Sequence, residues 1–132
     1  MKNRLAFATL SLLTFSLPLL AHHGNAAFDT SKRVTVKGTV IEWLWANPHC
    51  VLTFDAKDES GKIVRWNVEA GIPSDMVRRG WAKSSVSPGD EVTVTMTPAK
   101  NGRPLGRLEK LVTSDGRTFS GGIPPDSPTE AK

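Results

Sequence analysis

Five segments in which apolar and polar residues alternate, one short helical segment and one long strand containing a glycine predict an all-β fold. The alternation has the period of two that is typical of half-buried strands. It occurs three times before the helical segment and twice after it, which is the order of elements in the OB-fold. We therefore predict an OB-fold-like five-stranded Greek-key barrel with one short helix between strands three and four. An open β-sandwich of the same strands is the alternative that this order leaves open.

The first three strands are separated by clear breaks in the sequence. They are predicted at residues 33–45, 49–56 and 63–68. Gly38 lies in the middle of the first strand, where a glycine commonly marks a bulge or a bend. Asn47 and Pro48 end that strand, and residues 58–61 (DESG) form a hairpin turn. A long strand with a glycine supports the barrel, because the first strand must serve both sheets.

The second half of the chain supplies the helix and the last two strands. Pro73 opens and Gly80 closes a stretch that contains apolar Met76 and Val77, which predicts one or two helical turns. The last strands are predicted at residues 91–97 and 105–114, with a brief extension at 117–119. The tail, residues 121–132, holds three prolines and little that could pack, so we predict it to be disordered.

Residues 1–21 have the composition of a secretory signal peptide. Lys2 and Arg4 precede an uncharged apolar run at residues 5–20, and small residues follow it. We prefer cleavage after Ala21; cleavage near Leu20 or Ala26 and an uncleaved anchor are the alternatives, although the run is short for a membrane span of about 20 residues. The mature domain is then residues 22–120, without a stable membrane span. We expect it in the periplasm or outside the cell.

Charge and cysteine content limit the partners of this domain. The 132 residues include 17 Lys and Arg against 13 Asp and Glu, a formal charge of +4. Loss of Lys2 and Arg4 with the leader leaves 15 basic residues and a charge near +2, which weakens the case for an anionic partner such as nucleic acid. Cys50 is the single cysteine and cannot form an internal disulfide. Burial as a small apolar residue is its favoured role, ahead of pairing with another chain or ligating a metal.

Seven short motifs occur in a distinctive order along the mature chain. They are His22-His23-Gly24, Ala27-Phe28-Asp29, VTVKG from Val34, Asn47-Pro48-His49, WNVE from Trp66, Arg79-Gly80-Trp81 and PGDEV from Pro88. As a set they resemble the exported bacterial family called domain of unknown function 6152, over residues 22 to about 119. The resemblance implies an exported small β protein without an assigned reaction, and it transfers no catalytic residue.

The three histidines are candidate metal ligands. If cleavage makes His22 the amino terminus, its amine and ring nitrogen can chelate one metal, and His23 or His49 can complete a planar nitrogen set that suits Cu(II) or Ni(II). Cleavage after Leu20 gives a different chelate, and cleavage after Ala26 removes His22 and His23. Solvated histidines at a frayed terminus are the favoured alternative. A copper-binding protein is therefore the alternative function, and no cofactor is assured.

The tryptophans are candidate ligand contacts. Trp43 and Trp45 share one face of the first strand, and Trp66 lies on the third. Aromatic side chains on an OB sheet can stack against ligands, but burial in the core is favoured in a domain this small. The predicted ligand-binding residues are Trp45, His49 and Trp66, for an unknown small ligand or a periplasmic protein.

Catalytic signatures are missing from the sequence. It has no G-x-S-x-G, no glycine-rich phosphate loop and no nucleophile paired with a base. The basic residues Arg103 and Arg107 are interpreted as part of a solvated face. The leading prediction is an exported binding module that is not an enzyme and does not bind nucleic acid.

Overall fold

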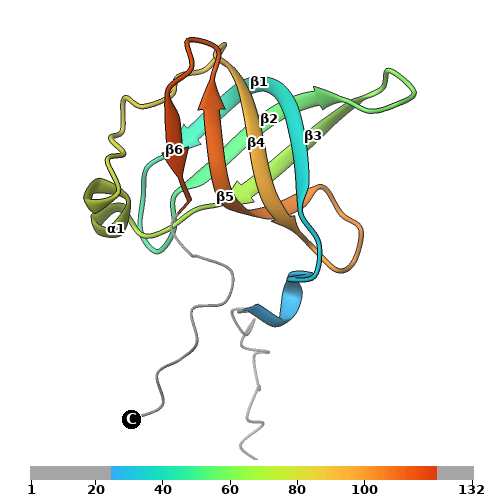
Figure 1. Ribbon diagram of the computed structural model, residues 1–132, viewed down its shortest axis with the longest axis horizontal. Coiled ribbons are helices and arrows are strands. Elements are labelled where there is room, and N and C mark those ends of the chain that lie inside the picture. The colour runs from blue at the N-terminus through green and yellow to red at the C-terminus, as the bar shows by residue number, and fades with distance from the viewer. Residues whose placement is uncertain (1–24, 122–132) are drawn as a thin grey trace, which may run out of the picture.

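The computed structural model describes residues 25–121, and the predictions for the leader, for His22 and His23, and for residues 122–132 lie outside this range. The elements, in chain order, are a 3-10 helix η1 (Asn25–Ala27), β1 (Val34–Leu44), β2 (Val51–Lys57), β3 (Ile63–Glu69), the helix α1 (Pro73–Arg78), β4 (Glu91–Pro98), β5 (Leu105–Thr113) and β6 (Thr118–Ser120). Figure 1 shows the strands curled around one core, with α1 at one side.

The strands form one closed sheet. Their order is β3-β2-β1-β4-β5-β6, with antiparallel neighbours. Closure comes from a parallel pairing of β3 with β5, in which Asn67 lies opposite Leu105 and Glu69 opposite Arg107. The predicted extension at 117–119 is β6, which adds to β5 outside the five barrel strands. The predicted all-β, OB-like five-stranded barrel with a short helix between strands three and four is confirmed.

The first strand serves two neighbours, as a barrel requires. Its first half, from Val34 to Thr39, pairs with β4, and its second half, from Thr39 to Leu44, pairs with β2. Gly38 lies where the two halves meet: a Cβ there would stand 2.3 Å from the carbonyl oxygen of Asp55. The register shift against β2 falls between Val40 and Glu42 instead. Gly38 therefore permits a close approach of β1 to β2, and the irregularity comes just after it.

The second strand begins later than the sequence suggests. His49 and Cys50 were expected to open it, but β2 begins at Val51. The Cys50 amide donates to the carbonyl of Gly71 at 3.0 Å, while the amide of Ala70 donates to the carbonyl of Cys50 at 2.8 Å. This one-residue offset removes Cys50 from the regular ladder, and His49 lies in the loop from residue 45 to residue 50.

The core fills the barrel interior. Its fully buried side chains include Leu52, Phe54, Val68, Val94, Met96, Leu108 and Leu111. Cys50 is fully buried among them, which confirms the favoured role for this residue. These positions alternate with more exposed ones along β2, β4 and β5, as the period-two pattern requires, with one interruption each in β4 and β5 near the register shift at Thr95 and Met96.

The segment before β1 is fixed to the barrel, which the sequence did not indicate. Phe28 is 2% exposed and forms an isolated bridge with Ala99. The guanidinium of Arg107 lies 4.8 Å from the centre of its ring, and Arg33 pairs with Glu109 at 2.7 Å. Within residues 25–121, no helix has the length and hydropathy needed to cross a membrane.

Candidate functional site

The tryptophan predicted to contact a ligand, Trp45, is the outer member of an aromatic stack. The stack consists of Trp45, Trp43, Trp81 and Phe119, with ring centres separated by 5.8, 5.2 and 4.7 Å in that order. Trp43 and Trp81 are 8% and 2% exposed, whereas Trp45 is half-buried. Core burial, which the sequence analysis favours for Trp43, Trp45 and Trp66, is confirmed for Trp43. Trp81, which that prediction did not include, is also buried. One side of Trp45 remains available at the surface.

The two buried indoles of the stack differ in hydrogen bonding. The Trp81 Nε1–H donates to the carbonyl oxygen of Ser120 at 2.7 Å, which joins the segment after α1 to the end of β6. The Trp43 Nε1–H is buried and has no partner within the described residues. A buried donor without a partner loses the free energy of its hydration, so Trp43 contributes less than its contact area suggests.

His49 lies in the same loop as Trp45, which joins β1 to β2, and its side chain is exposed. The next residue, Cys50, faces the interior, and burial raises the pKa of its thiol. The sulfur of Cys50 is enclosed by core side chains, whereas the His49 ring lies at the surface. The pair does not form a joint metal site in this arrangement.

Trp66 lies elsewhere in the barrel. It is half-buried in the middle of β3, opposite Phe54 of β2. Ala70, whose amide bonds to Cys50 beside His49, is four residues further along the chain, just past the end of β3, about 13 Å at the rise of an extended chain. The structure thus brings Trp45 and His49 into one loop and places Trp66 away from them. Whether the three residues bind a ligand stays a prediction.

A cleft opens between β3 and the loop formed by residues 99–104. Its volume is about 310 Å³, and it is lined by Asn67, Arg103, Pro104 and Leu105. We call it the β3 cleft. The Asn67 amide donates to the carbonyl of Pro104 at 3.1 Å, and its side-chain oxygen accepts a bond from the Thr53 hydroxyl at 3.0 Å. One wall of the cleft is therefore held by both backbone and side-chain bonds.

Arg103 is the charged residue of this cleft. Its side chain is exposed, and its guanidinium has no hydrogen bond or ion pair with any residue from 25 to 121. The sequence interpretation grouped it with Arg107 as part of a solvated face, yet Arg107 lies against Phe28. Only the neighbouring turn residues of KNGRP indicated that Arg103 stands on a loop.

The half-buried carboxylate of Asp55, on the neighbouring strand β2, is already paired. Asp55 accepts two bonds from the guanidinium of Arg65, at 2.8 and 2.9 Å. These bonds lower the pKa of the Asp55 carboxyl. Among residues 25–121, no three His, Cys, Asp or Glu side chains gather into a group that could hold a metal ion. A copper site would therefore need His22 or His23, which lie outside the described residues.

A family profile decides the relationship that the ordered motifs suggested. The profile of a family of unknown function (DUF6152) matches residues 9–108. The chain belongs to this family. The matched range begins within the apolar run at residues 5–20, includes the loop of Trp45 and His49 and the loop of Arg103, and ends in β5. DUF6152 has no assigned activity, and no curated protein matches the chain.

Proposed function

We propose that this DUF6152 protein is an exported, non-enzymatic binding module that holds a carboxylate-bearing ligand in the β3 cleft. Arg103 carries the proposal, since it places an exposed guanidinium without a partner among residues 25–121 beside a cleft of about 310 Å³. A guanidinium recognises a carboxylate through two parallel N–H donors. Asn67, fixed by Thr53, provides a neutral polar wall opposite this charge.

The proposal is tested by titrating the ¹⁵N-labelled protein with N-acetylglutamate and, as the neutral match, N-acetylglutamine. We expect the glutamate compound to shift the amide resonances of Asn67, Arg103 and Leu105, and the glutamine compound to shift them far less. Arg103→Gln should abolish the difference. Arg79→Gln, which changes an exposed arginine at the end of α1, is the matched control and should preserve it. Equal shifts from both compounds, or shifts spread over the surface, would reject the proposal.

Trp45, His49 and Trp66 remain the predicted aromatic contacts of such a module, for a small ligand or a periplasmic protein. The fluorescence of the half-buried Trp45 and that of Trp66 report on two separate surfaces, because the two side chains lie in different parts of the barrel. Trp45→Phe should remove any ligand-induced change in fluorescence that arises at the loop of His49. If the change persists in this variant and disappears in Trp66→Phe, the contact belongs to β3.

Export is supported by the leader composition and by the DUF6152 match, which includes residues 9–20 of the apolar run. We expect the protein in the periplasm or the medium, with residues 1–21 removed. Cell fractionation followed by intact-mass measurement tests both points. A full-length chain in the cytoplasm would contradict them.

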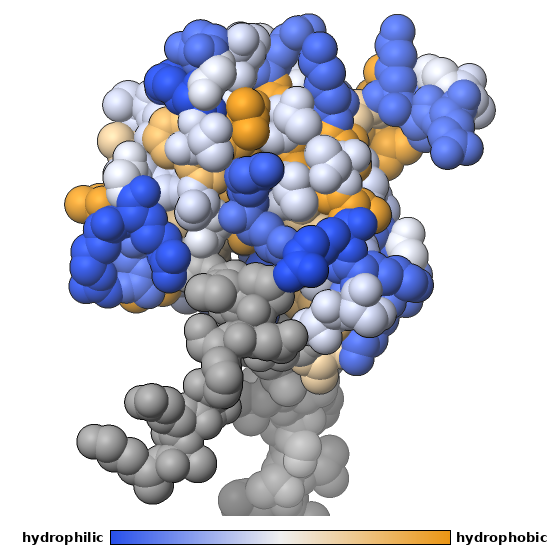
Figure 2. Space-filling view, in the orientation of Figure 1, coloured by the Kyte–Doolittle hydropathy of each residue, from blue (hydrophilic) through white to orange (hydrophobic). Residues whose placement is uncertain are grey.

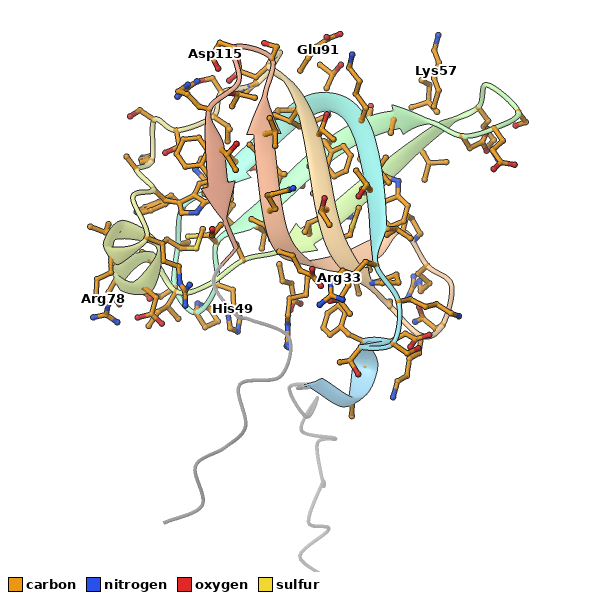
Figure 3. All side chains as sticks on the ribbon, in the orientation of Figure 1. Arg33, His49, Lys57, Arg78, Glu91 and Asp115 are labelled. Atoms are coloured by element: carbon orange, nitrogen blue, oxygen red, sulfur yellow. The ribbon has the colours of Figure 1, made fainter. Side chains whose placement is uncertain are left out.

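Copper binding through His22, His23 and His49 is the second candidate. One observation favours it: Figure 3 shows His49 at the same end of the barrel as η1, the first described element. His22 precedes Asn25, the first residue of η1, by three residues in the chain. The segment with the two histidines therefore joins the domain at the end that carries His49.

The copper candidate is tested in two steps. Intact mass first fixes the amino terminus, since a chain that begins at Ala27 or later has lost His22 and His23. Cu(II) titration then compares the exported protein with a His22→Ala, His49→Ala variant, which should bind at least about tenfold more weakly if these nitrogens are ligands. Unchanged affinity in the variant would eliminate the candidate.

A further inference from the structure

One edge of β3 is unpaired over half its length. β3 pairs with β2 along all seven residues, but with β5 only through Asn67, Val68 and Glu69. Among residues 25–121, residues 63–66 therefore have a neighbour on one side alone. Figure 1 shows the β2–β3 hairpin projecting from the barrel at this point. We call residues 63–66 the open edge.

The backbone groups of the open edge follow from the hydrogen-bond pattern. The amide of Asp58 donates to the carbonyl of Lys62 at 2.8 Å, so even-numbered residues of β3 bond to β2. Odd-numbered residues face the other way, as Asn67 shows by donating to Pro104. Ile63 and Arg65 thus direct two amides and two carbonyls away from β2. An exposed row of such groups is a template for another strand.

The side chains along this edge suit an extended chain. Ile63 is 54% exposed, and the bidentate pair with Asp55 holds Arg65 on the outer face of the sheet. Figure 2 shows hydrophobic and hydrophilic residues next to each other on the projecting hairpin. The edge therefore offers one apolar contact to an added strand. Its charges are the Asp55–Arg65 pair and the exposed amines of Lys57, which lies opposite Ile63, and Lys62.

The open edge ends at the β3 cleft. The carbonyl of Pro104 takes the amide of Asn67, so the loop of residues 99–104 occupies the position that follows Arg65 along the edge. A strand added parallel to β3 would continue the parallel pairing that begins between Asn67 and Leu105. Its carboxyl end would then face Arg103, whose guanidinium has no partner among residues 25–121.

We propose that the open edge binds the extended carboxyl-terminal segment of a partner protein as an added parallel strand, with Arg103 holding the terminal carboxylate. The inference rests on the proposed function and names its ligand class. Backbone bonds to Ile63 and Arg65 supply affinity that does not depend on sequence. The charge on Arg103 selects a chain end, because an internal segment has no carboxylate at that position.

The test uses the purified protein and a fluorescein-labelled pentapeptide, Ser-Thr-Val-Thr-Val, with a free carboxyl terminus. Binding is measured by fluorescence anisotropy against the same peptide with an amidated terminus. Amidation should weaken binding at least about tenfold. Arg103→Gln should remove the difference between the two peptides, and Arg79→Gln should keep it.

Strand addition is tested on the peptide, where changes cannot unfold the protein. Peptides that each carry one N-methyl group on a different amide should fall into two sets, because only every second amide of the peptide faces β3. One set should lose binding at least about tenfold, and the other should retain it. Hydrogen exchange at the amides of Ile63 and Arg65 should slow when the peptide is added, while that of Val68, already in the barrel seam, should not change.

Each remaining outcome has a definite meaning. Equal binding of free and amidated peptides, or no contrast between the two N-methylated sets, would overturn this inference. If N-acetylglutamate still shifts Asn67 and Leu105 in that case, the proposed function survives without it. A dimer that excludes the peptide and dissociates on dilution would assign the open edge to a second copy of the chain and reject the peptide partner.

Discussion

The two ends of β3 lie in opposite surroundings. At Glu69 the strand pairs with both β2 and β5, and the following Ala70 and Gly71 are buried. At Ile63 it pairs with β2 alone and is 54% exposed. One seven-residue strand therefore joins a closed barrel at one end and an unpaired edge at the other. This contrast separates the part of a very small domain that stabilises the fold from the part that we propose binds a ligand.

The aromatic stack lies near the end of β3 at Glu69, where the strand pairs with both β2 and β5 and which we call the closed end. Trp43 lies opposite Leu52, which lies opposite Val68 near the β3–β5 seam. Trp81 packs on Trp43 and bonds to Ser120, so it joins β1, the segment after α1 and β6. Within the described residues the open edge has no stack of rings: Trp66 is half-buried against the core, and the exposed contacts are the Asp55–Arg65 pair and the side chain of Ile63. Substitutions at the two ends should therefore differ strongly in cost.

The largest effect is expected for Trp81→Ala. The side chain is 2% exposed and contacts two other rings, so its removal should cost about 3–5 kcal/mol of unfolding free energy. Arg103→Ala, at the β3 cleft, should change stability by no more than about 0.5 kcal/mol. Urea unfolding measures both variants. Similar costs for the two would show that the closed end does not carry most of the stability.

The next effect concerns the close approach of β1 to β2. Gly38→Ala would place a Cβ 2.3 Å from the carbonyl oxygen of Asp55 and 2.7 Å from a ring carbon of Phe54. Because the nearer obstacle is backbone, the barrel wall must move, at a cost of about 3 kcal/mol. Gly61→Ala, in the turn beside the open edge, meets nothing within 4 Å and costs only the strain of its positive φ of 84°, about 1 kcal/mol. Thermal unfolding of both variants checks this order.

The sequence predicted the elements better than it predicted their contacts. Alternation and turn residues act within a few positions, so the strands, the helix at Pro73 and the break at Pro48 were all identifiable. The β3–β5 pairing joins Asn67 to Leu105 with no local signal, and the open edge exists only because that pairing stops there. Arg103 was recognisable as basic, but its lack of a partner among residues 25–121 had no local signal, because a partner carboxylate would have to be brought near it by the fold.

Within the closed end, hydrogen bonding should separate two similar indoles. Trp81→Phe removes the bond from Nε1 to Ser120, whereas Trp43→Phe removes a buried donor that has no partner in residues 25–121. Trp43→Phe should therefore cost about 1 kcal/mol less than Trp81→Phe. Urea unfolding under one set of conditions compares the two variants. The reverse order would mean that the Trp43 N–H is satisfied in solution.

The smallest effect is expected at the Asp55–Arg65 pair beside the open edge, where the free energy of unfolding should depend on pH. Hydrogen bonds from Arg65 lower the pKa of the Asp55 carboxyl, so in the folded protein it should titrate below the usual value of about 3.9. The pair then stabilises the fold above the unfolded-state pKa and stops doing so as the pH falls through the folded-state pKa. Titration of the ¹³C carboxyl resonance measures this directly.

The matching variant decides whether that pair persists in solution. Arg65→Gln should move the Asp55 midpoint upward, because it removes both guanidinium donors. Arg117→Gln, which breaks the pair with Asp115 instead, should leave the Asp55 midpoint unchanged. Exposed ion pairs contribute little to stability and weaken with salt, so the upward shift should shrink at high ionic strength. An Asp55 midpoint that is unchanged by both Arg65→Gln and salt would mean that the Asp55–Arg65 pair does not persist in solution.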